Sequence, residues 1–171
     1  MKTANYGWQQ RLRELYDKAL VKYGNDHRKV ETMFTPREVN VLRAFGAKPM
    51  ELYDYAEDSS DLDWETALLI SAARRDYFMH EQREQWTDKL IVVDELPAKT
   101  DEMEGIVWLP RIIEKAKARL RGEMPNELMY CCGGDRRFFR TYDIHPADFL
   151  RLVWSAKGRP DKILAYVKGD R

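Results

Sequence analysis

The sequence predicts an all-α fold of two packed, small helical halves, with one short extended segment near residues 90–93. Apolar residues recur every three or four positions along most of the chain, as they do on the buried face of a helix. Proline repeatedly stands where such a stretch begins and glycine where it ends, which is the pattern of helix boundaries. Residues 90–93 are the only β-branched run suited to a strand, and one strand cannot form a sheet, so an extended linker is the alternative.

Helix signals divide the first half of the chain into four segments. The expected helices cover residues 6–23, 36–45, 49–56 and 64 to about 83. The second has the clearest start, because Thr35 and Glu38 form a capping box around Pro36. The fourth contains neither glycine nor proline, and Asp63 can cap it. We therefore expect it to be the central helix of this half.

Four more helices are expected in the second half, beginning near residues 110, 135, 146 and 160. Proline begins three of them and glycine ends the same three: Pro110 and Gly122, Pro146 and Gly158, Pro160 and Gly169. The remaining one follows a glycine-containing turn at residues 131–135. Paired boundary residues of this kind define helix ends more sharply than hydrophobic periodicity alone.

Composition narrows the class of protein. The chain has 171 residues and a formal net charge of zero, so no nucleic-acid partner is expected. No apolar run approaches the ~18 residues that a membrane span needs, and the first ten residues lack the apolar core of a secretion signal. Cys131 and Cys132 are adjacent, and because a disulfide between neighbours is strained, both are expected to be reduced. These features predict a soluble, cytoplasmic protein with no membrane partner; they do not decide whether it forms a homo-oligomer.

Charge is distributed unevenly between the two halves. Residues 1–98 contain 14 Lys and Arg against 18 Asp and Glu, whereas residues 99–171 contain 15 against 11. We therefore predict an acidic N-terminal helical domain over 1–98 and a basic C-terminal helical domain over 99–171. Either the two halves attract each other or the basic half binds an anion. Ligand sites favour domain interfaces, so a pocket is expected between the halves.

Three cations could form an anion site on the helix that begins at residue 110. Arg111, Lys115 and Arg119 are spaced i, i+4 and i+8, and this spacing places them on one helix face. Such a face can hold a phosphate or a carboxylate. Alternatively, it is solvated, or it pairs with acids of the first half.

A second candidate is the turn that contains the cysteines. Gly133 and Gly134 let backbone N–H groups approach a ligand, the following helix start favours an anion, and Arg136 adds a cation. The same surroundings would activate the thiol of Cys132. Against this interpretation, Asp135 is a good N-cap that would occupy those N–H groups itself, and an unpaired cysteine is a common core residue.

A metal site has little support, and no cofactor is indicated. The histidines, His27, His80 and His145, are widely scattered. Asp76, His80 and Glu84 share a helix face and could supply three ligands, but the chain has no Glu-x-x-His pair and no zinc-type spacing. We expect no metal, and we expect His145 to be a helix cap or a surface residue.

Residues 104–168 resemble an uncharacterised bacterial family, domain of unknown function 5069. The resemblance is carried by residues 105–111 (Gly-Ile-Val-Trp-Leu-Pro-Arg), Lys115, Ala116, Arg119, Gly122, Tyr130, Cys132, Asp135, Phe149, Leu150 and residues 164–167 (Leu-Ala-Tyr-Val). It implies a small helical domain. It implies no activity, because none is established for the family. The family pattern has one cysteine, so Cys131 is an addition in this chain.

Three functional hypotheses follow. The first is a binding module for a small anionic ligand, lined by Arg111, Lys115, Arg119, Gly133, Gly134 and Arg136. The second is an enzyme that uses Cys132 as a thiolate, with Asp135 as a further candidate catalytic group. The third is a protein-interaction domain without a small-molecule site. The sequence leaves open whether the protein is an enzyme.

Overall fold

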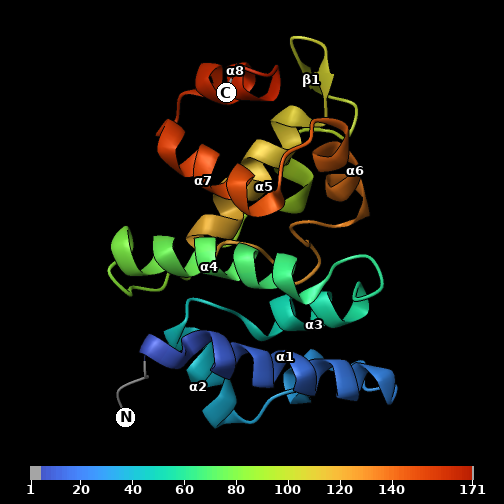
Figure 1. The fold of residues 1–171 in the computed structure, drawn as a ribbon, viewed down its shortest axis with the longest axis vertical. Helices are drawn as coiled ribbons and strands as arrows, with labels where there is room; N and C mark the ends of the chain where they lie inside the picture. The colour runs from blue at the N-terminus through green and yellow to red at the C-terminus, as the bar shows by residue number, and fades with distance from the viewer. Residues whose placement is uncertain (1–4, 171) are drawn as a thin grey trace. The chain divides into compact units, whose positions relative to one another are not determined.

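The computed structural model of the chain describes residues 5–170, most of which are helical (Figure 1). Its backbone forms two compact units, which meet in the sequence between Trp86 and Thr87. Among the described residues, the only β-structure is a small hairpin in the second unit. The mainly helical fold class predicted from the sequence is thus confirmed.

The N-terminal unit contains the four helices that the sequence predicts. They are α1 (Trp8–Gly24), α2 (Pro36–Ala44), α3 (Pro49–Glu57) and α4 (Trp64–His80), with short 3-10 turns at Asn5–Gly7 and Val30–Thr32. The capping box is present: the Thr35 amide donates to Glu38 Oε2 (2.8 Å), and the Glu38 amide donates to Thr35 Oγ1 (3.3 Å). Helix α4 ends before residue 83, because Arg83 and Glu84 have positive φ values (49° and 61°) that no helix continues.

Apolar side chains of α1, α2 and α3 make the core of this unit. Helix α1 packs on α3, and the buried residues include Leu12, Leu15, Ala19, Leu42, Phe45 and Leu52. Gly46 follows α2 with a φ of 73°, and a Cβ there would lie only 2.8 Å from the Cβ of Phe78. Only glycine therefore allows α4 to approach the end of α2 so closely.

The C-terminal unit also contains the four expected helices, and three of them start at or next to the predicted proline. Its elements are a 3-10 turn at Val93–Glu95, β1 (Glu102–Met103), β2 (Ile106–Val107), α5 (Leu109–Arg121), α6 (Gly133–Thr141), α7 (Pro146–Ala156) and α8 (Pro160–Val167). Helix α5 packs on α7, and α7 packs on α8. Ile112, Ile113, Phe149 and Leu150 are buried in this unit.

Residues 90–93 follow the extended-linker alternative and do not form a strand: the chain is extended at Val92, and the Ile91 amide bonds to the Glu123 carbonyl (2.9 Å). One feature of this unit was not expected from the sequence. The hairpin is formed by β1 and β2, joined by Glu104 and Gly105, both with positive φ (47° and 82°). Strands of two residues are too short to show an alternating pattern, so the sequence did not predict them.

None of the helices within residues 5–170 is long and apolar enough to cross a membrane.

Candidate functional site

The cation stripe of α5 faces protein more than solvent. Lys115 is 1% exposed and Arg119 is 4% exposed. Arg111 is half-buried and donates from Nη1 to the Pro97 carbonyl (2.8 Å). The helical spacing places these residues on one face, as predicted, but this face is mostly buried.

The ammonium group of Lys115 contacts the carboxylate of Asp135, which has no exposed surface. Asp135 Oδ2 accepts from Lys115 Nζ (2.5 Å) and from the Cys131 amide (2.9 Å), and Oδ1 accepts from Trp108 Nε1 (3.0 Å). A buried charge must be both paired and hydrogen-bonded. Lys115 and Asp135 fulfil both requirements for each other. We call Trp108, Lys115, Cys131, Cys132 and Asp135 the polar centre.

Asp135 is not the N-cap of α6, as the sequence had suggested it could be. The helix begins at Gly133, so Cys132 is the N-cap residue and Asp135 lies in the first turn. From there its carboxylate reaches back to the Cys131 amide instead of covering the N–H groups of the glycines. The two glycines are helical, and for this reason the helix starts two residues earlier than expected.

Two residues of the polar centre hold uncommon backbone conformations. Trp108 and Cys131 have φ values of 77° and 70°, which cost of the order of 1–3 kcal/mol for side chains of this kind. Asp135 bonds to both of them, to the indole of one and to the amide of the other. A Cβ on Gly134 would lie 2.5 Å from Cζ2 of Trp108, so the indole packs directly on the first turn of α6.

The adjacent cysteines lie in different surroundings, and both are unpaired thiols. Cys131 is buried; burial, followed by the charge of Asp135, raises its pKa to about 12. Cys132 is half-buried, and its Sγ lies 3.4 Å from Lys115 Nζ. Of the two, only Cys132 combines access to solvent with a neighbouring cation.

The structure thus brings together part of the set named from the sequence. Lys115, Cys132 and Asp135 meet, and Arg136 donates to the Cys131 carbonyl (2.8 Å) with its guanidinium beside Gly133. Sequence reasoning did not name Trp108 as part of a site. A tryptophan before Leu-Pro gives no sign that its backbone is left-handed or that its indole reaches a carboxylate 27 residues away.

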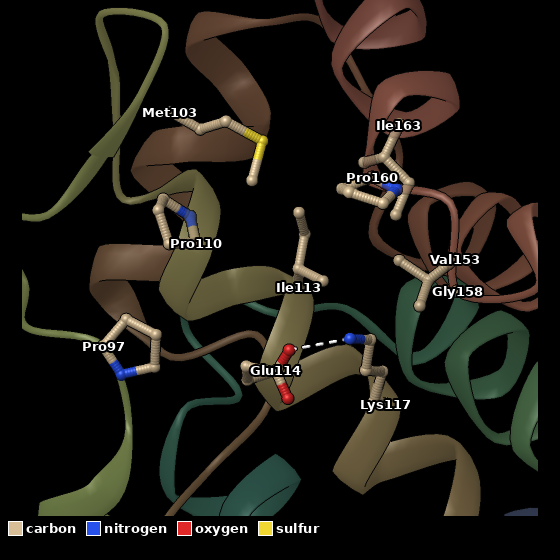
Figure 2. A pocket seen from close by; sticks show the side chains of 10 residues that line it. All are labelled: Pro97, Met103, Pro110, Ile113, Glu114, Lys117, Val153, Gly158, Pro160 and Ile163. Carbon is tan, nitrogen blue, oxygen red and sulfur yellow. Dashed lines mark hydrogen bonds and ion pairs between the residues drawn. The ribbon is translucent and has the colours of Figure 1, made fainter.

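A pocket of about 280 Å³ lies elsewhere in the same unit (Figure 2). We call it the apolar pocket. Its lining comes from the segment before β1, from β1, α5 and α7, from the turn after α7 and from α8: Pro97, Met103, Pro110, Ile113, Glu114, Lys117, Val153, Gly158, Pro160 and Ile163. Glu114 and Lys117 form an ion pair at one end (2.7 Å). Figure 2 shows Met103 reaching from the hairpin toward Ile113, with Ile163 on the opposite side.

The histidines have structural roles where their contacts are seen. His145 is the N-cap of α7, and its Nδ1 accepts from the Ala147 amide (3.1 Å), which confirms the expected cap. The proposed ligand stripe on α4 is interrupted, because Glu84 lies beyond the end of that helix with a φ of 61°. Within residues 5–170, no group of three or more His, Cys, Asp or Glu side chains is placed to hold a metal ion.

The fold and these features define the C-terminal unit as a small helical domain with a buried ion pair and an apolar pocket. Residues 94–171 match the family model of a domain of unknown function, DUF5069, which confirms the resemblance seen in the sequence. The matched region contains the whole polar centre and all residues that line the apolar pocket. No curated protein matches the chain. No solved structure matches it either.

Proposed function

We propose that the C-terminal unit is a binding module for a small carboxylic acid whose apolar body enters the apolar pocket. The observation that carries this proposal is the pocket itself, about 280 Å³ in volume and lined mainly by aliphatic side chains and prolines, with a single ion pair at one end. Small-molecule sites are typically concave and mostly apolar, with a few polar groups that fix orientation. The sequence suggested a small anionic ligand near the cations of α5 and the glycine turn. This proposal also has a small anion as the ligand but assigns it to the apolar pocket.

The two sides of the pocket differ in charge: the hairpin side carries the acids Asp101, Glu102 and Glu104, and the α8 side is basic and is where a ligand carboxylate would lie. Gly158 and Ile163 line this side, and the chain around them carries Lys157, Arg159 and Lys162 against one acid, Asp161. Lys117 is partly exposed at the pocket and can exchange Glu114 for a ligand carboxylate.

The polar centre is the less favourable place for such a ligand. Lys115 and Asp135 already neutralise each other in a region without solvent. An anion that took Lys115 would leave the Asp135 carboxylate buried without its counter-charge, and breaking a buried pair in this way costs about 3–5 kcal/mol. Binding between Arg111, Lys115, Arg119 and the residues Gly133, Gly134 and Arg136 remains the competing location.

Methyl NMR of the full chain can test the proposal with octanoate as the probe. We expect saturable shifts at the methyl groups of Met103, Ile113 and Ile163, and no such shifts with inorganic phosphate, which has no apolar body. Val153→Phe should fill the pocket and abolish the octanoate shifts. Val92→Phe, at an exposed position outside the lining, is the matched control. Octanoate shifts that survive Val153→Phe, or that gather at the amides of Gly133 and Gly134, would contradict the pocket assignment.

A second candidate function is thiol chemistry at Cys132. It is favoured by the start of α6, which attracts negative charge, and by the Lys115 ammonium 3.4 Å from the sulfur, although Lys115 shares its charge with Asp135. In this role the thiol loses its proton to solvent, and the sulfur attacks an electrophile and displaces its leaving group.

Reaction with an aromatic disulfide reagent tests this candidate. The Cys132 thiolate would attack one reagent sulfur, form a mixed disulfide and release the aromatic thiolate, which is coloured. We expect one thiol of the native protein to react rapidly and Cys132→Ser to remove that reaction. A native Cys132 that reacts no faster than free cysteine would eliminate the candidate.

A further inference from the structure

We infer that the β1–β2 hairpin is a movable wall of the apolar pocket. The ion pair between Glu104 and Lys168, which we call the clasp, holds the hairpin near α8. The movement and the clasp are properties of the unliganded protein. Only their effect on ligand exchange rests on the proposed function.

The ion pair connects two walls of the pocket. Glu104 follows Met103, the hairpin residue that lines the pocket, and Lys168 follows α8, which supplies Pro160 and Ile163 to the lining. In Figure 2, Met103 lies across the pocket from the two α8 residues. A contact between Glu104 and Lys168 therefore fixes the distance between the hairpin and α8.

The turn of the hairpin is exposed, whereas Ile106, the first residue of β2, is buried. Its strands are two residues each, and an isolated two-stranded hairpin is marginally stable in water. The turn residues Glu104 and Gly105 are both exposed.

The base of the hairpin, by contrast, is firmly attached. The Trp108 amide donates to the Asp101 carbonyl (3.1 Å), and the Asp101 side chain accepts from the Ala98 amide (2.9 Å). The indole of Trp108 is bound to Asp135 of the polar centre. A fixed base and an exposed turn would let the tip of the hairpin move away from α8, and this movement has to draw the buried Ile106 outward as well.

The clasp is weak enough to open repeatedly. Both of its side chains are largely exposed, and an exposed ion pair changes an equilibrium by only about two- to five-fold. Salt screens such a pair, so opening should become more frequent as ionic strength rises. If the proposed ligand binds, its rates of entry and exit would follow the clasp.

Relaxation-dispersion NMR on the Met103 methyl group of the ligand-free full chain measures the opening directly. We expect Glu104→Lys and Lys168→Glu each to raise the open population about two- to five-fold, and the double variant, in which the charges are exchanged, to restore the wild-type value. The Trp108 amide at the hairpin base is the internal control and should not change. Salt at about 0.5 M should raise opening in the wild type and not in the single variants.

Each outcome decides one of the two proposals. Single variants with wild-type opening, or a double variant that fails to restore it, would overturn the clasp whether or not any ligand binds. Octanoate that fails to bind would overturn the proposed function and leave the dispersion result valid. Octanoate that binds with the same release rate in wild type and Glu104→Lys would show that ligand exchange bypasses the hairpin.

Discussion

Among the described residues, Arg74 in the N-terminal unit and Lys115 in the C-terminal unit are fully buried cations, and the contacts seen at the two differ. In the N-terminal unit, Arg74 donates to the Gln82 side-chain oxygen (2.5 Å) and lies 5.1 Å from the centre of the Phe78 ring and 5.3 Å from that of Trp86. In the C-terminal unit, Lys115 forms an ion pair with Asp135. A guanidinium is weakly hydrated and stacks on aromatic rings, whereas an ammonium is a compact, strongly hydrated charge that needs an anion when buried.

This difference determines how strongly each unit is destabilised when one polar contact is removed. The partners of Arg74 include an amide oxygen and two rings, so the loss of one contact leaves others in place. Lys115 depends on one carboxylate, which also holds two left-handed residues. The C-terminal unit should therefore be the more sensitive of the two to a single polar substitution.

Replacing the carboxylate should have the largest effect. Asp135→Asn leaves the Lys115 ammonium buried without an anion, and we expect a loss of about 3–5 kcal/mol in the unfolding free energy of the C-terminal unit. Denaturant titration of the full chain, followed by NMR signals of each unit, measures it. Asp161→Asn, an exposed acid of the same unit, is the control. A loss below about 1 kcal/mol would mean that Lys115 does not require the carboxylate.

A methyl group on the first turn of α6 should have the next largest effect. Gly134→Ala drives a Cβ into the Trp108 indole, and we expect it to destabilise the unit by about 1–3 kcal/mol and to alter tryptophan fluorescence. Gly133→Ala is a closely matched control, because the nearest atom there is an arginine side-chain nitrogen at 3.8 Å. Equal effects of the two substitutions would show that the indole is not confined by Gly134.

The corresponding substitution next to Arg74 in the N-terminal unit should lower the unfolding free energy by less. Gln82→Ala removes the hydrogen bond to Arg74 but leaves both rings, so we expect a loss of about 1.5 kcal/mol. The same denaturant titration, read from signals of α1 and α3, gives the value. A loss as large as that of Asp135→Asn would break the comparison, since it would show that the rings do not support the guanidinium.

A rise from pH 9 to pH 10 should produce the smallest effect, and it acts through Cys131 of the C-terminal unit. Above pH 10 the N-terminal unit should also lose stability, because burial raises the pKa of Tyr16, Tyr23 and Tyr53. The pKa of Cys131 is about 12 in the folded state against 9.0 for an ordinary cysteine, so above pH 9 the unfolded chain loses a proton that the folded chain keeps. The contribution of Cys131 to stability therefore falls as pH rises above about 9, by about 1 kcal/mol between pH 9 and 10 and by about 3 kcal/mol in all by pH 12. Unfolding measured across this range should lose that component in Cys131→Ala. An unchanged slope in the variant would assign the effect to other groups.

The helices were predictable because their boundary signals are local. Thr35 with Glu38, Pro110 with Gly122, and His145 before a proline act within a few residues of the ends they set. The resemblance in the C-terminal part was visible for the same reason, as a pattern along the chain.

The candidate sites were predictable only in part, because they depend on contacts between distant residues. Helical spacing placed Lys115 on one face with its neighbouring cations but could not show that Asp135, 20 residues away, would neutralise it. The φ value of Trp108 has no signature in a single sequence. The apolar pocket could not be predicted, because its lining comes from separate segments and none of them carries a binding motif by itself.

The position of Asp135 also has a kinetic consequence. Its three donors come from residues 108, 115 and 131, so two of them are 20 and 27 residues away along the chain. An intermediate in which only α5 or only α6 has docked would place a lone charge in an apolar interior, which is costly. These segments should therefore dock together late in folding, and this part of the chain should cross its barrier in one cooperative step.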